Sequence, residues 1–171
     1  GRSDRLRLPK RGCRVFSQAP GLAAERVVPL EGTTLQRAFL ADLDGDGRID
    51  LLYTAPGEQQ VRIRLGEGAD FGPEHAFRIG SLSFLTTGDV SDAPGEEILA
   101  VQQNPLRVSV FGLAKRKSTG ALGRILAYAL PGGAAREIQA LAPGDIDGHG
   151  LPEPCVALAH GAESGLYPIQ T

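Results

Sequence analysis

Ala41-Asp42-Leu43-Asp44-Gly45-Asp46-Gly47-Arg48-Ile49-Asp50-Leu51-Leu52-Tyr53 is the stretch on which the interpretation of this chain rests. Asp42, Asp44, Asp46 and Asp50 take positions 1, 3, 5 and 9 of a short loop that glycines punctuate. Carboxylates this crowded repel one another unless a cation offsets their charge, and Ca²⁺ accepts hard oxygen ligands at this spacing. We therefore expect residues 42–50, the first loop, to bind calcium through these four side chains.

Segments of β-forming residues flank the first loop. Residues 35–40 lead into it and residues 49–54 leave it, while residues 61–65 alternate apolar side chains with arginine, which is typical of a half-buried strand. We expect residues 66–72 to form a loop and residues 75–79 to form a fourth strand. A module of about 45 residues with four strands has the size of one propeller blade.

The module recurs twice along the chain. Residues 82–99 align with residues 35–52, so that Asp89 matches Asp42 and Glu97 matches Asp50 in a second loop, residues 89–97. Ser91 and Ala93 replace two carboxylates there, so we expect no metal in the second loop. A third loop, residues 145–153, reads Asp-Ile-Asp-Gly-His-Gly-Leu-Pro-Glu.

The repeats predict one all-β region over residues 1–171, built from blades of four antiparallel strands. Its approximate units are 13–33, 34–80, 81–136 and 137–171, and a solvated basic insertion at 114–124 lengthens the third of these. Because the first and last units are partial, we expect a segment of a larger propeller, about three to four blades of it, with further blades supplied by a parent chain.

Composition narrows the classes of function. The net charge is −2 and 42% of residues are hydrophobic, which does not favour a nucleic-acid or anionic-membrane surface. No apolar run approaches the roughly 18 residues of a spanning helix.

The chain begins at Gly1 and contains no methionine, so we expect a processed product, an excised domain or a fragment. Cys13 and Cys155 leave two alternatives open, a disulfide or two free thiols.

Residues 41–52, followed by residues 61–66 and by Phe71-Gly72-Pro73, resemble the FG-GAP/VCBS repeat family of integrin-α-like β-propellers. This resemblance implies Ca²⁺ in loops between the first and second strands of each blade, and it implies no activity. It adds the backbone carbonyl of Arg48 to the ligands of the first loop. For the third loop it implies the following ligands: Asp145, Asp147, His149, the Leu151 carbonyl and Glu153. His149 should weaken that site, since a neutral imidazole is a poor ligand for a hard cation.

Other readings of the acidic loops are a solvated turn without metal, an EF-hand or a dockerin. An EF-hand needs an acid at position 12, where this chain has Tyr53. A dockerin needs a second loop close by with helices between, whereas the next good copy of the loop begins at Asp145. Neither of these two classes fits.

Catalytic motifs are missing from the sequence. The three histidines, His75, His149 and His160, lie in no recognisable nucleophile or zinc motif. We therefore expect a module that binds a protein or carbohydrate ligand or serves as a scaffold. The alternative is a catalytic or non-catalytic propeller part of a glycan-degrading lyase or hydrolase. Because such calcium loops commonly work at millimolar Ca²⁺, we expect an extracellular, periplasmic or cell-surface location.

Overall fold

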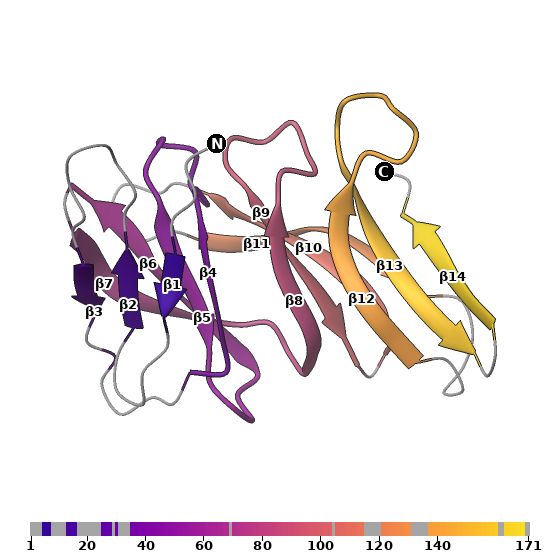
Figure 1. The fold of residues 1–171 in the computed structure, drawn as a ribbon, viewed down its shortest axis with the longest axis horizontal. Coiled ribbons are helices and arrows are strands. Elements are labelled where there is room, and N and C mark those ends of the chain that lie inside the picture. Colours follow the sequence, from indigo (N-terminus) through magenta and orange to yellow (C-terminus); the bar gives the residue numbers. More distant parts are fainter. Residues whose placement is uncertain are drawn as a thin grey trace. The chain divides into compact units, whose positions relative to one another are not determined.

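The structure is a computed structural model that describes residues 5–7, 13–16, 25–28, 30, 35–68, 70–103, 105–114, 121–130, 137–160 and 163–169. Every regular element in these ranges is a β-strand, and every strand pair is antiparallel (Figure 1). The predicted all-β class is therefore confirmed. No helix in the described ranges is long and apolar enough to cross a membrane.

The strands pair with their neighbours in sequence, so each sheet is a meander. The four sheets are β1 (Arg5–Arg7), β2 (Cys13–Phe16) and β3 (Glu25–Val28); β4 (Arg37–Ala41), β5 (Asp50–Thr54), β6 (Gln60–Glu67) and β7 (Asp70–Arg78); β8 (Leu82–Gly88), β9 (Glu97–Gln102), β10 (Arg107–Ala114) and β11 (Ala121–Ala129); and β12 (Glu137–Gly144), β13 (Glu153–His160) and β14 (Glu163–Pro168). Each of the three acidic loops thus joins the first and second strands of its sheet.

The chain divides into two compact units. The first contains residues 1–41 and 48–78, and the second contains residues 42–47 and 79–171. The tip of the first loop, Asp42–Gly47, therefore belongs with the second unit.

In the first unit, all five residues of strand β5 are buried. Leu51 and Tyr53 pack with Val28 and Leu30 into one apolar cluster. Tyr53 is 0% exposed and donates its hydroxyl hydrogen to the Glu74 carboxylate on β7. Apolar side chains and one polar pair thus hold this central strand in place.

In the second unit, strand β9 is buried throughout. Its residue Val101 packs with Val108 of β10 and with Val156 and Leu158 of β13, so one apolar cluster spans both sheets. Strand β12 also contacts β8 and β9. The sheets of this unit therefore share a core, as expected for repeats that cannot bury their faces alone.

The prediction of a loop over residues 66–72 is wrong in its extent, because strands occupy most of this range. Strand β6 runs to Glu67 and β7 starts at Asp70, with Gly66 paired to Phe71. A register shift between Arg64 and Gly66 lets the hairpin continue through its glycines. The basic insertion is likewise shorter than expected, because β10 extends to Ala114 and β11 starts at Ala121; residues 115–120 lie outside the described residues.

Cys155 is buried. The side chain of Cys13 lies outside what the structure describes, so a disulfide and two free thiols stay alternative predictions. Burial raises the pKa of this thiol, and the nearby Glu153 carboxylate raises it further. The thiol stays protonated at neutral pH and is inert as a nucleophile.

Candidate metal-binding loops

The first loop brings three of its four aspartates together. Oxygen atoms of Asp42, Asp44 and Asp50 all lie within 4.8 Å of one another. Two oxygens bound to one Ca²⁺, each at about 2.3–2.6 Å, are separated by no more than about 5 Å. Asp44 is 8% exposed and Asp50 is 1% exposed, so these carboxylates are withdrawn from bulk water. The spacing of the three carboxylates is compatible with one shared cation.

Backbone amides of the loop hold two of these carboxylates in position. The Asp46 amide donates to Asp42 Oδ1 at 3.1 Å and to Asp44 Oδ1 at 3.2 Å. The Gly47 amide donates to Asp42 Oδ2 at 2.8 Å. Gly45 and Gly47 have φ of 69° and 82°, the left-handed conformation that glycine adopts at little cost. These turns aim successive amides and side chains toward the same point.

The third member of the group, Asp50, is oriented from outside the loop. Its Oδ1 accepts a 2.8 Å hydrogen bond from the Gly66 amide on β6. A Cβ at residue 66 would lie 2.6 Å from the Ile49 carbonyl oxygen, so only glycine allows this close approach. Gly66 is thus a site-forming residue that the ligand pattern did not identify. Its one signal in the sequence is a glycine inside a strand pattern.

Two further ligands expected in the first loop lie outside the group of three. Asp46, half-buried, contributes its amide to the neighbouring carboxylates, as described above. Arg48, whose carbonyl the family resemblance implies as a ligand, is exposed. Their roles as ligands stay predictions.

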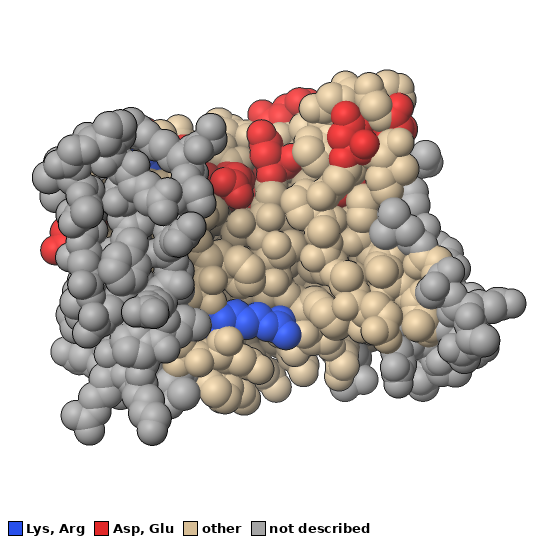
Figure 2. Space-filling view, viewed as in Figure 1, with Lys and Arg blue, Asp and Glu red and all other residues tan. Residues whose placement is uncertain are grey.

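The third loop repeats the conformation of the first. Oxygen atoms of Asp145, Asp147 and Glu153 lie within 4.8 Å of one another. The Gly150 amide donates to Asp145 Oδ2 at 3.0 Å, as the Gly47 amide does to Asp42. The corresponding glycines again have positive φ: 76° at Gly148 and 90° at Gly150. Figure 2 shows acidic side chains grouped over this loop, between β12 and β13.

His149 lies outside the group of three in the third loop. Its Nδ1 lies 2.7 Å from Asp147 Oδ2, and its side chain is 81% exposed. This hydrogen bond raises the pKa of His149 and holds the pKa of Asp147 below its usual range. A protonated His149 occupies one oxygen of Asp147, which opposes cation binding there. Leu151, expected to contribute a carbonyl, is half-buried, and both ligand roles stay predictions.

The second loop, which the structure describes in full, has no group of three carboxylates like those of the other two loops, and hydrogen bonds to Glu97 and Ser91 hold its conformation. Glu97 is buried; its Oε2 accepts from the Val90 amide at 2.9 Å and its Oε1 accepts from the Ser91 hydroxyl at 2.5 Å. The Ser91 hydroxyl in turn accepts from the Ala93 amide at 3.1 Å, as Asp44 does from the Asp46 amide. Ser91 thus replaces an aspartate in its hydrogen-bonding role without adding charge.

The second loop also supports the tip of the first. The Glu96 amide donates to the Asp42 carbonyl at 2.6 Å. Gly95 has a φ of 90°, and a Cβ there would lie 2.7 Å from the Gly45 amide nitrogen and 2.8 Å from the Leu43 carbonyl. The two backbones therefore touch. Burial raises the pKa of Glu96, and the carboxylates of Asp89 and Asp42 raise it further.

Comparison of the chain with protein-family models, with curated proteins and with solved structures finds no match.

Proposed function

We propose that this chain is a calcium-binding repeat module of the FG-GAP/VCBS type, whose four-stranded sheets are blades of a β-propeller. The observation that carries the proposal is the group of carboxylate oxygens from Asp42, Asp44 and Asp50, mutually within 4.8 Å, in a loop whose amides already orient them. The recurrence of the same hydrogen bonds in the third loop supports it. Two solvated acidic turns without a metal would not require the same hydrogen-bonded conformation in both loops.

Bound Ca²⁺ would supply positive charge and would link the start of the first loop to β5. Asp42, Asp44 and Asp50 would hold it in the first loop, and Asp145, Asp147 and Glu153 in the third. The chain's own groups do the positioning: amides from within the loop orient the first two carboxylates, and the Gly66 amide orients Asp50. The ion would thus fix the connection between the first two strands of a sheet.

We infer a binding or scaffold role for the module, with a protein or carbohydrate partner. The loops support this role, since the acidic clusters are tied to loop geometry and His149 pairs with Asp147 on the surface. Rigid sheets that present loops of differing sequence suit recognition. Extracellular sites of this kind usually bind Ca²⁺ weakly, so they fill only where the Ca²⁺ concentration is millimolar. We therefore extend the proposal to an extracellular, periplasmic or cell-surface location.

Isothermal titration with CaCl₂ tests the metal proposal. We expect the wild-type chain to bind at the first loop, and Asp50→Asn to weaken that binding at least tenfold because it replaces a buried anionic ligand with an amide. Asp92→Asn is the matched control, since Asp92 is exposed in the second loop and belongs to neither group of three. Equal affinity in Asp50→Asn and wild type would contradict the assignment of the site.

Assay of the chain against a panel of polysaccharides, with detection of reducing ends and of unsaturated products, tests the binding role against the glycan-degrading alternative. We expect binding to a partner without turnover. Product formation that disappears when a described residue is substituted, with the β-sheet circular dichroism unchanged, would replace the scaffold role with an enzymatic one.

A further inference from the structure

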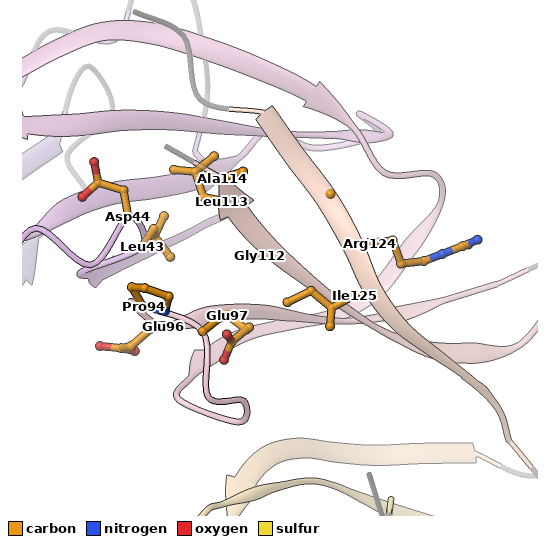
Figure 3. A pocket seen from close by; sticks show the side chains of 12 residues that line it. Leu43, Asp44, Pro94, Glu96, Glu97, Gly112, Leu113, Ala114, Arg124 and Ile125 are labelled. Atoms are coloured by element: carbon orange, nitrogen blue, oxygen red, sulfur yellow. The ribbon is translucent and has the colours of Figure 1, made fainter. Parts of the chain in front are cut away.

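A pocket of about 400 Å³ lies in the second unit, beside the β10–β11 hairpin. Its apolar lining comes from Leu43, Pro94, Gly112, Leu113, Gly123 and Ile125 (Figure 3). This volume is within the range of about 300–1,000 Å³ that is usual for small-molecule sites. These apolar residues take no part in the proposed metal site, although Asp44, which belongs to that site, also lines the pocket.

Of two paired glycines, Gly123 leaves open space, while Gly112 lets the Ile125 side chain pack against its backbone. Gly112 and Gly123 face each other across β10 and β11. A Cβ on Gly123 would meet no atom within 4 Å, so the missing side chain leaves open volume. Ile125, two residues further along β11, is 44% exposed although it is large and apolar. The pocket therefore offers an apolar surface that stays in contact with water in the free chain, and burying this surface would favour binding.

The charges around the pocket are distributed unevenly. Figure 3 shows the carboxylates of Asp44 and Glu96 on one side, while the Arg124 side chain extends toward the opposite side. Glu97 also lines the pocket, but its carboxylate already accepts hydrogen bonds from Val90 and Ser91. With a divalent ion in the first loop, Asp44 would be bound to that ion, and Glu96 is the carboxylate that would remain at this side of the pocket.

We propose that this pocket binds a small organic cation: an apolar body that fills the space over Gly123 beside Ile125, with an ammonium group at the side of Asp44 and Glu96. The apolar body gains from covering Ile125 and Leu113, and the ammonium group gains from the negative potential of the carboxylates. A carboxylate in the same position would be repelled. The charge of the ligand should therefore decide its affinity when its shape is kept constant.

Three probes with the same ring test this selectivity: cyclohexylmethylamine, cyclohexylmethanol and cyclohexanecarboxylate. Each is titrated into the ¹⁵N-labelled chain, and amide shifts are followed at Gly112, Gly123 and Ile125. We expect the amine to bind at least tenfold more tightly than the carboxylate, with the alcohol between them. Equal affinities for the three probes, or shifts confined to other residues, would overturn the proposal.

Gly123→Leu fills the pocket without a clash at Cβ and should abolish the shifts caused by the amine. Ala127→Leu is the matched control, since Ala127 is exposed on the same strand and does not line the pocket; it should leave the binding of the amine within twofold of wild type. Retained binding in a folded Gly123→Leu variant would place the ligand elsewhere and refute the site. All titrations are run in EGTA and in CaCl₂: the order of the probes should persist in both, so this outcome is independent of whether the first loop binds calcium.

Discussion

Asp50, Glu97 and Glu153 occupy the same place in the three loops, yet their carboxylates are held by different partners. The two glutamates reach back to an amide seven residues earlier, Glu97 to Val90 at 2.9 Å and Glu153 to Ile146 at 3.2 Å. Asp50 has a shorter side chain and accepts from the Gly66 amide instead. The place requires a buried, hydrogen-bonded carboxylate whether or not a metal is present. A single acid in this place is therefore weaker evidence for metal than the group of three.

Also at the scale of single residues, Tyr53 makes the stability of the folded chain depend on pH. Burial and the hydrogen bond to Glu74 raise the pKa of Tyr53 to about 12 in the folded chain, against about 10 in the unfolded chain. Because the unfolded chain loses this proton first, the stability that Tyr53 contributes is complete below pH 10 and is lost between pH 10 and 12. The loss should reach roughly 2–3 kcal/mol, measured as the free energy of unfolding in urea.

Tyr53→Phe is the control for this titration. It removes a buried hydroxyl, which should cost about 1 kcal/mol at pH 7, and its stability should fall less steeply above pH 10. Identical slopes for Tyr53→Phe and wild type between pH 10 and 12 would show that Tyr53 does not titrate with the stated shift.

At the scale of the element, the second loop acts as a support for the first. Gly95 lies so close to Gly45 that any side chain at residue 95 displaces the tip of the first loop. We expect Gly95→Ala to lower stability by about 1–3 kcal/mol, since it adds both a positive-φ strain and a backbone clash. It should also weaken Ca²⁺ binding, although it alters no ligand. Urea unfolding and calcium titration measure the two effects.

Gly57→Ala separates the effect of backbone strain from the effect of the clash between the second loop and the first. Gly57 also has a positive φ, 74°, but a Cβ there meets nothing within 4 Å. This variant should show only the conformational cost, about 1 kcal/mol, with unchanged affinity for Ca²⁺. If both variants lower the affinity equally, the support of the first loop by the second is not the cause.

Strand order was readable from the sequence because it depends on local spacing. The alternation at residues 61–65 and the apolar run after Asp50 predicted β6 and β5. The aspartate pattern named the three carboxylates that come together, but it also included Asp46, which lies outside that group. Contacts made by backbone across long separations were not readable. The Gly66 amide on Asp50 and the packing of Gly95 against Gly45 depend on the absence of a side chain, which leaves no chemical signature in the pattern.

At the scale of the molecule, the all-β class followed from turn density and short alternating segments. The division into two units did not, because it depends on which core each sheet joins. In the second unit Val101 and Val156, from different repeats, share one apolar cluster. The pocket over Gly123 was equally hidden, since it depends on the register between β10 and β11.

Thermal unfolding across a CaCl₂ series, from micromolar to 10 mM with EGTA as the zero point, tests the central claim that the first loop binds calcium. At a hundredfold excess over Kd, binding to the folded chain adds about 2.7 kcal/mol, or roughly 5–10 °C in Tm. We predict that rise for the wild-type chain, and we predict that Asp44→Ala removes most of it. A Tm that stays constant over the whole series would contradict the calcium-binding account.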